Sequence, residues 1–188
     1  MYIDQTVYTG APANCTERAE REQACYRLLE ELGIAYTRVD HDAADTIELC
    51  HEIEGLLGTE ICKNLFLCNR QQTDFYLLLM QGDKNFRTKD LSKQLGVSRL
   101  SFAGAEHMQE FLGLTPGSVS VLGLMNDQAH RVRLVIDKPL LEAEFFGCHP
   151  CLNTSTLRMK TQGVLNILIP ALVADYTVVD LPEPEPAE

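Results

Sequence analysis

The stretch that decides the fold is Ile61-Cys-Lys-Asn-Leu-Phe-Leu-Cys68, followed after a polar turn by the apolar run Phe75-Tyr-Leu-Leu-Leu-Met80. Two such runs, joined by the polar residues 69–74, are typical of a β-hairpin. Both runs are nearly continuous in apolar residues rather than alternating, so we expect the hairpin to be covered on both faces. The hairpin therefore predicts the centre of a sheet.

Helices and short strands flank this hairpin without a regular alternation. Asn14, with Glu17 three positions on, predicts the capped start of a helix that ends at Gly33. Further helices are expected at residues 45–58, 88–95, 105–112 and 164–174. Further strands are expected at 36–40, 99–103, 131–137, 145–146 and 176–180, and residues 131–137 alternate as in a half-exposed strand. This order predicts an α+β fold, a single domain with a mixed, strongly curved sheet.

Length and composition indicate one folded domain. The 188 residues suffice for one hydrophobic core, and 45% apolar with 23% charged residues excludes a disordered chain. We expect an irregular lead-in over 1–13, the domain over 14–180 and an acidic, proline-rich tail over 181–188. No apolar run could span a bilayer, no export leader is recognised, and the seven cysteines show no disulfide framework, so a cytoplasmic location is expected.

The charge is unevenly distributed along the chain. The net charge of −11 argues against binding to DNA, because affinity for a duplex depends on neutralising many phosphates. Residues 1–60 hold thirteen acidic and four basic side chains, whereas residues 83–99 hold two acidic and five basic ones. The five basic residues are Lys84, Arg87, Lys89, Lys93 and Arg99. They indicate either an ordinary solvated helix face or a path that steers one nucleic-acid strand into a pocket.

Lys63 interrupts the first apolar run of the hairpin. An unpaired ammonium is costly to bury, so this lysine either points outward from a sheet edge or lies at a pocket wall with a partner. At a pocket wall it would hold an anionic or carbonyl oxygen. The pattern alone leaves both interpretations open.

A second candidate stretch is Gly147-Cys-His-Pro-Cys-Leu-Asn-Thr154, whose glycine and proline predict a loop. Cys148, His149 and Cys151 suggest zinc ligands. A structural zinc site needs four ligands, however, and the sequence holds no second Cys-x-x-Cys pair. A thiol nucleophile beside His149 is a further hypothesis, which adjacency in sequence supports only weakly.

A third stretch, Leu114-Thr-Pro-Gly-Ser-Val-Ser-Val-Leu-Gly-Leu-Met-Asn-Asp127, predicts an elaborate loop. A turn at Pro116 and Gly117 would expose backbone N–H groups that can bind an oxygen. The stretch lacks the Gly-Lys-Ser/Thr ending of a P-loop, so nucleoside triphosphate binding is not indicated. Loops of this length are uncommon unless functional, and an ordinary structural loop is the alternative.

Five ordered segments together resemble the YbaK/ProX family of free-standing aminoacyl-tRNA editing domains, and within it the prolyl-tRNA editing (prolyl-tRNA synthetase associated domain) proteins. The segments are Lys63-Asn-Leu-Phe-Leu67, Arg99-Leu-Ser-Phe-Ala103, Pro116-Gly-Ser-Val119, Gly123-Leu-Met-Asn-Asp127 and His149-Pro-Cys-Leu-Asn-Thr154. The resemblance covers about residues 18–179 and implies a barrel-like, YbaK-like sheet. One departure, Ser120-Val-Leu122 where similar members carry a proline, bears on which amino acid fits.

The resemblance implies hydrolysis of the ester in a mischarged tRNA(Pro), without a cofactor or a metal. Lys63, which matches the family's essential lysine, would hold the terminal phosphate or the ester carbonyl. The N–H groups of Gly117 and Ser118 would stabilise the oxyanion, and His149 would orient the substrate or the attacking water. The residues expected to bind substrate are Asn64, Val119, Leu122, Asn126, Asp127, Asn153 and Thr154.

Alanine is the amino acid expected from this resemblance, because apolar contacts exclude a smaller side chain by only about 1–3 kcal/mol per group. Val119 and Leu122 are expected to line a pocket too small for proline. The expected partners are the acceptor end of tRNA(Pro), approached past the basic residues of 83–99, and prolyl-tRNA synthetase; neither a membrane nor DNA is expected. A cysteinyl-tRNA(Pro) deacylase and a non-catalytic module that docks on a synthetase are the alternatives.

Overall fold

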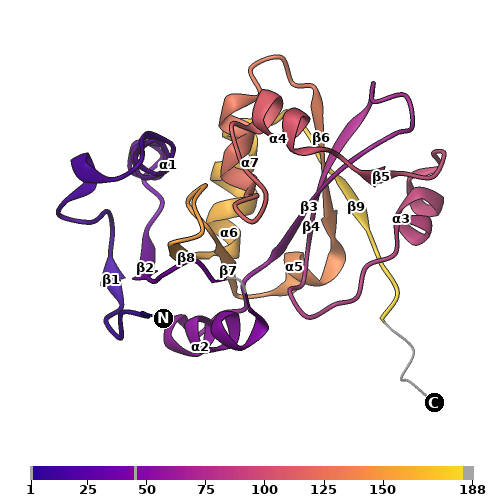
Figure 1. Ribbon diagram of the computed structural model, residues 1–188. Coiled ribbons are helices and arrows are strands. Elements are labelled where there is room, and N and C mark those ends of the chain that lie inside the picture. Colours follow the sequence, from indigo (N-terminus) through magenta and orange to yellow (C-terminus); the bar gives the residue numbers. More distant parts are fainter. Residues whose placement is uncertain (1, 45, 184–188) are drawn as a thin grey trace.

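Two open β-sheets form the centre of the structure, and the expectation of one strongly curved, barrel-like sheet is wrong. The computed structural model describes residues 2–44 and 46–183. A four-stranded antiparallel sheet has the order β1-β2-β8-β7, and a five-stranded mixed sheet has the order β5-β3-β4-β6-β9. The two sheets lie in different halves of the molecule, with helices around both (Figure 1). The α+β class predicted from the sequence is confirmed.

The strands of the two sheets come from all parts of the chain. Those of the four-stranded sheet are β1 (Tyr8–Thr9), β2 (Tyr36–Asp40), β7 (Phe145–Cys148) and β8 (Ser155–Lys160). Those of the five-stranded sheet are β3 (Lys63–Cys68), β4 (Phe75–Met80), β5 (Ser101–Phe102), β6 (Val132–Asp137) and β9 (Thr177–Val179).

The helices follow the expected ranges closely in the middle of the chain. They are α1 (Glu20–Glu31), α2 (Ile47–Leu57), α3 (Thr88–Leu95), α4 (Ala105–Leu112), α5 (Lys138–Glu142), α6 (Thr161–Gly163) and α7 (Ile169–Leu172). Two 3₁₀ segments (Cys15–Glu17 and Val121–Asn126) and a π-helical segment (Val164–Leu168) complete them. None of these helices is long and apolar enough to cross a membrane.

The hairpin β3–β4 is the centre of the five-stranded sheet, as predicted. Its register pairs Lys63 with Met80 at one end and Cys68 with Phe75 at the other. Alternate residues of β4 enter two separate apolar cores, Leu77 on one face and Leu78 on the other. Every residue of β4 is buried, which confirms a strand that is covered on both faces.

Strand β6 is more buried than its alternating sequence predicts. It lies between β4 and β9 and runs parallel to both, so its two edges are paired. Arg133 is its one exposed residue, and the expected half-exposed face is wrong. Central parallel strands are covered on both sides, and the covering segments are not visible in the sequence of the strand itself.

Both ends of the chain differ from the expectation. Helix α1 begins at Glu20 rather than after Asn14, because the chain first forms a short 3₁₀ turn and then extends at Arg18. The lead-in contributes strand β1, which pairs with β2. At the other end Leu181, the expected first residue of the tail, is buried; residues 184–188 of that tail lie outside the described residues.

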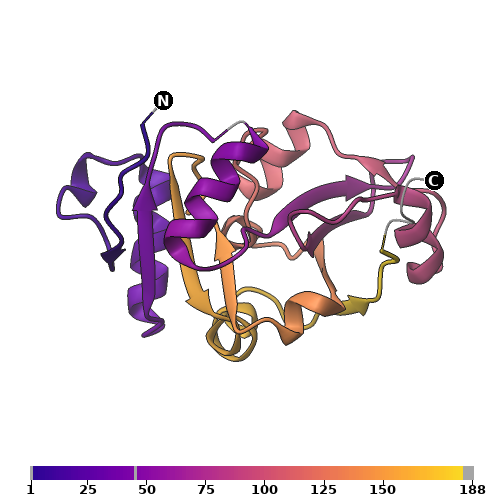
Figure 2. The same ribbon diagram turned by 90° about the horizontal axis from the view of Figure 1, so that it is seen from below.

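Helix α2 lies across the junction of the two sheets. Thr46 caps its first turn by accepting a hydrogen bond from the Leu49 N–H, and Gly58 ends it with a φ of +66°. Its buried residues Ile53 and Leu57 pack with Val39 of β2 in a small core. Seen from below, α2 lies in front of β7 and β8, close to the start of β3 (Figure 2).

Candidate active site

Gly147 joins the two sheets at the point where the candidate site forms. The Cys62 N–H donates to the Gly147 carbonyl at 2.9 Å, and Ile61 pairs with Gly147 in an isolated parallel bridge. A Cβ on Gly147 would lie 2.5 Å from the Glu60 carbonyl oxygen. Because only glycine permits this approach, strand β7 delivers His149 beside the start of β3, where Lys63 lies.

Lys63 and His149 line the same cleft, which has a volume of about 300 Å³. Helix α2 forms one wall, and the turn after β4 contributes Gly82 and Asp83. The remaining lining residues are Ala44, Thr46, Ile47, Cys50, His51, Glu54, Ile61 and Cys62. The structure thus brings together two residues that are 86 positions apart in the chain.

The Lys63 ammonium is half-buried and held by the main chain. Its Nζ donates to the carbonyl oxygen of Lys84 at 2.8 Å. An ammonium has three hydrogens to donate, so two remain for a substrate in the cleft. Of the two interpretations that the sequence leaves open, the structure favours the one in which Lys63 lies at a pocket wall.

His149 is a neutral base whose tautomer the fold selects. Burial lowers the pKa of His149 to about 4, so the ring carries no charge at neutral pH. Its Nδ1 lies 2.9 Å from the carbonyl oxygen of Ser155. A carbonyl only accepts hydrogen bonds, so Nδ1 holds the proton and Nε2 is left as a hydrogen-bond acceptor.

A second histidine, His41, supports this arrangement from strand β2. Its Nδ1 donates to the Asp42 carbonyl at 2.7 Å, and its Nε2 accepts from the Thr156 hydroxyl at 2.9 Å. Burial lowers the pKa of His41, which is neutral as well. The sequence patterns did not single out His41, because Thr156, the partner of its Nε2, comes from the distant strand β8.

The carbonyl that holds His149 belongs to a residue in a charged network. The Ser155 hydroxyl donates to Asp40 at 2.6 Å, and Asp40 also forms ion pairs with Arg18 and Arg38. Burial by itself would raise the pKa of Asp40, but the hydrogen bonds from Arg38, Ser155 and Arg18 outweigh it and lower the pKa. Asp40 therefore stays ionised and fixes Ser155 at the start of β8.

Asn64 and Asn153 lie next to the two central residues. The Asn64 Nδ2 donates to the Cys62 carbonyl at 3.0 Å, whereas its Oδ1 is buried without a partner among the described residues. Asn153 exchanges hydrogen bonds of 3.3 Å with the main chain of Ala44, which lines the cleft. The Thr154 carbonyl accepts from the His41 N–H at 3.0 Å.

The loop over 114–127 is placed differently from the expectation. Gly117 and Ser118 are not among the residues that line the cleft, and the Ser118 N–H donates to the Thr115 carbonyl at 3.0 Å. The prediction of a free oxyanion donor at Ser118 is therefore wrong. Leu122 is fully buried in the main core, and Val119 packs half-buried against it.

The polar residues at the end of this loop stabilise the fold through hydrogen bonds to the main chain. The Asn126 Nδ2 donates to the Leu112 carbonyl at 2.8 Å, which ties the loop to α4. The Asp127 carboxylate accepts the N–H groups of Arg131 and Val132 at 3.0 and 2.7 Å, at the start of β6. These contacts account for both residues as structural parts of the loop.

The basic stretch divides into one buried lysine and four exposed side chains. Lys84 is 4% exposed and pairs with Asp137, so the prediction that it meets tRNA at the surface is wrong. Arg87, Lys89, Lys93 and Arg99 are exposed on or near α3, at the far end of the hairpin from α2 (Figure 1).

The metal and thiol hypotheses find no support in this geometry. Within residues 2–44 and 46–183, no three His, Cys, Asp or Glu side chains are placed to hold a metal ion. Burial raises the pKa of the Cys148 thiol well above its usual value, so the thiol stays protonated at neutral pH. A protonated, fully buried thiol is a poor nucleophile.

Comparisons with known proteins bear on the family and the fold of the chain. Residues 41–167 match the model of the aminoacyl-tRNA editing domain family. A prolyl-tRNA editing protein ProX from Acetoanaerobium sticklandii is 34% identical over 79% of this chain and 91% of its own. The mouse prolyl-tRNA synthetase associated domain-containing protein 1 is 33% identical over 79% of this chain and 87% of its own.

A solved structure supports the fold independently. A putative trans-editing enzyme for prolyl tRNA synthetase superimposes with a TM-score of 0.67 and 20% identity, over 89% of this chain and 99% of its own. The family model matches more than half of the chain, and the ProX protein is similar over nearly its whole length. The chain therefore belongs to the aminoacyl-tRNA editing domain family.

Proposed function

We propose that this protein is a trans-acting editing hydrolase that removes alanine from mischarged alanyl-tRNA(Pro). The observation that carries the proposal is the cleft that both Lys63 and the neutral His149 line. The names of the ProX and mouse relatives point to prolyl-tRNA as the substrate class. The reaction is the addition of water to the ester carbonyl and release of the tRNA ribose hydroxyl.

Lys63 supplies the positive charge for this reaction. Attack on the ester places negative charge on the carbonyl oxygen, and a donor fixed beforehand stabilises that charge more than a mobile one. The bond to the Lys84 carbonyl fixes the ammonium and leaves two hydrogens for the ester oxygen or the terminal phosphate. With the Ser118 N–H engaged and Gly117 outside the lining of the cleft, the oxyanion role falls to Lys63.

His149 positions the attacking water. Its Nε2 accepts a hydrogen bond from water because Nδ1 already donates to Ser155. With a pKa of about 4 the ring is a weak base, so its contribution is orientation rather than complete removal of the proton. The proton lost by water passes to the departing ribose oxygen, aided by the neighbouring ribose hydroxyl.

The aminoacyl group fits the apolar wall of the cleft. Ala44, Cys50 and Ile61 line it, and Ile47 stands at its mouth with a side chain that is 68% exposed. A small side chain is accepted there, and discrimination against proline is by size. Asn64, expected from the sequence to bind substrate, is not among the residues that line the cleft.

The tRNA reaches the cleft through its single-stranded acceptor end. The exposed basic residues Arg87, Lys89, Lys93 and Arg99 attract its phosphates on a protein with a net charge of −11. None of these four residues lines the cleft, so they would contact the tRNA away from the ester. The mouse relative's name favours prolyl-tRNA synthetase as a partner in the cell.

The proposal is tested with three charged forms of one tRNA. Alanyl-, cysteinyl- and prolyl-tRNA(Pro) are incubated with the protein under single-turnover conditions, with and without a chelator. We expect alanyl-tRNA(Pro) to be cleared fastest and prolyl-tRNA(Pro) to persist. If the cysteinyl ester is cleared faster, the protein is a cysteinyl-tRNA(Pro) deacylase instead. If none of the three esters is cleared, the result supports a non-catalytic module. Loss of activity with the chelator would support the metal hypothesis.

A further inference from the structure

Lys84 links the Lys63 ammonium to a buried ion pair on the other side of the loop. Its main-chain carbonyl accepts from Lys63 Nζ at 2.8 Å, while its own Nζ lies 2.8 Å from Asp137 Oδ2. The Lys84 and Asp137 side chains are 2% and 0% exposed. Glu183, 72% exposed, is a second and more distant acidic group at 3.6 Å from the same Nζ.

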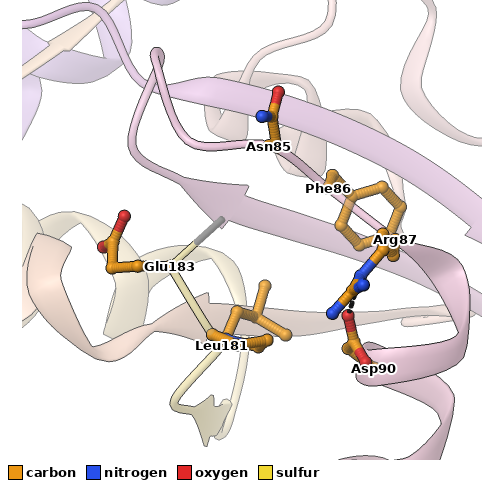
Figure 3. Close-up of a pocket in the computed structure, with 7 residues that line it drawn as sticks. Asn85, Phe86, Arg87, Asp90, Leu181 and Glu183 are labelled. Carbon is orange, nitrogen blue, oxygen red and sulfur yellow. Dashed lines mark hydrogen bonds and ion pairs between the residues drawn. The ribbon is translucent and has the colours of Figure 1, made fainter. Parts of the chain in front are cut away.

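Asp137 is in turn held by the C-terminal segment. Its Oδ1 accepts the Leu181 N–H at 2.9 Å, and the Leu181 side chain is buried in the second core. In Figure 3, Leu181 and Glu183 line one side of a hollow of about 240 Å³, and Asn85, Phe86 and Arg87 line the other. The C-terminal segment thus closes over the loop that carries Lys84.

A buried ion pair of this kind fixes geometry more than it adds stability. Replacing both members of such a pair by apolar side chains often leaves the stability of the protein unchanged, whereas removing one member leaves an uncompensated buried charge. The ammonium of Lys84 must therefore stay on Asp137, and the adjacent carbonyl of Lys84 is held in one place. Because this carbonyl accepts a hydrogen bond from Lys63 Nζ, its fixed position holds the Lys63 ammonium in one orientation.

We propose that Lys84 and Asp137 are positioning residues, which direct the Lys63 ammonium into the cleft through the Lys84 carbonyl. The proposal rests on the proposed function of Lys63 as the group that contacts the ester. It assigns the end of β6 and the segment around Leu181 to the catalytic apparatus, although neither lines the cleft.

The test uses Asp137→Asn and Lys84→Met in the full-length protein. We expect Asp137→Asn to lower kcat for the best aminoacyl-tRNA by about 10–100-fold, with a much smaller change in KM, because misplacement of a catalytic group by about 1 Å has effects of this size. A proton–nitrogen correlation spectrum of the lysine ammonium groups gives a second readout. The Lys63 signal, assigned by its absence in Lys63→Met, should shift or vanish in Asp137→Asn and in Lys84→Met.

Val135→Ala is the matched control, because Val135 lies on the same strand as Asp137, is buried in the same core as Leu181 and has no side-chain group that can form a hydrogen bond. It should lower stability while leaving kcat and the Lys63 signal unchanged. If the single variants do not fold, the double variant Lys84→Met/Asp137→Leu replaces both charges by apolar groups; loss of kcat and of the signal supports the proposal.

Wild-type kcat in Asp137→Asn or in the double variant, or a Lys63 signal that stays unchanged, overturns the proposal. The outcome is separable from that of the proposed function. If the wild-type protein deacylates no aminoacyl-tRNA, the proposed function fails, and the ammonium spectrum still decides whether Asp137 positions Lys63.

Discussion

Lys63 enters the cleft from the five-stranded sheet and His149 from the four-stranded sheet, and each donates to a main-chain carbonyl. For Lys63 the carbonyl is that of Lys84, and for His149 it is that of Ser155. Both carbonyl-bearing residues have side chains in buried polar contacts, with Asp137 in one case and Asp40 in the other. The same device thus holds both groups in place.

The two sides differ in charge. The five-stranded sheet presents an ammonium, whereas the four-stranded sheet presents a ring that burial keeps neutral, with a pKa of about 4. In the proposed reaction the cation would stabilise the oxyanion, and the neutral acceptor, which lines the same cleft, would orient water. The proposed function therefore divides the work of the site between the two sheets, and the following experiments test that division.

Removing the cationic side should have the largest effect. We expect Lys63→Met to lower the single-turnover rate by about 10²–10³-fold, as for loss of one oxyanion donor in other enzymes. The matched control is Lys160→Met, because Lys160 is exposed at the end of β8 and does not line the cleft. Equal rates for Lys63→Met and Lys160→Met would remove Lys63 from the mechanism.

Replacing the neutral residue, His149, should lower the rate by less than replacing Lys63, and by an amount that depends on the new side chain. We expect His149→Ala to lower the rate by about 10–100-fold, because water loses its acceptor. His149→Gln should retain more activity, since an amide oxygen also accepts a hydrogen bond without carrying charge. A glutamine variant as inactive as the alanine variant would show that the imidazole takes part in proton transfer instead.

Disturbing the junction should affect both sides together. Gly147→Ala places a Cβ 2.5 Å from the Glu60 carbonyl oxygen, and we expect it to lower the free energy of unfolding by about 1–3 kcal/mol. Gly163→Ala is the control, because its Cβ would meet nothing closer than 3.9 Å. Urea denaturation measures both, and a Gly147→Ala protein as stable as the wild type contradicts the close approach of the sheets.

His149 should also make the stability of the protein depend on pH. The unfolded chain binds a proton on this ring below about pH 6.5, whereas the folded protein does so only near pH 4. The free energy of unfolding should therefore fall as the pH decreases from about 6.5 to 4, by an amount on the order of 3 kcal/mol. His149→Gln should reduce this slope in urea titrations, and an unchanged slope would mean that His149 is not buried neutral.

The centre of the fold was predictable from local pattern, and the contacts between its parts were not. The hairpin at 61–80, helix α3 and helix α4 were predicted at their observed positions, because apolar runs and glycine stops are local signals. Strand β8 was missed, since its sequence follows a loop signal and one of its two partners, β2, is distant in the chain. The division into two sheets has no local signature.

The site was predictable in its two main residues and not in their supports. Lys63 stood out as a charge in an apolar run, and His149 through its glycine- and proline-bearing loop. Lys84 was taken for a surface charge, because nothing in its neighbourhood reveals that Asp137 is its buried partner. His41 carried no signal for the same reason.

The central claim is that Lys63 and His149 act as one unit on an aminoacyl ester. A double-mutant cycle of wild type, Lys63→Met, His149→Ala and the double variant tests it, with single-turnover hydrolysis of alanyl-tRNA(Pro) as the measurement. Groups that act together show strongly non-additive losses. We predict that the double variant is no slower than the Lys63→Met protein within about threefold. Rate losses that multiply in the double variant would contradict the account.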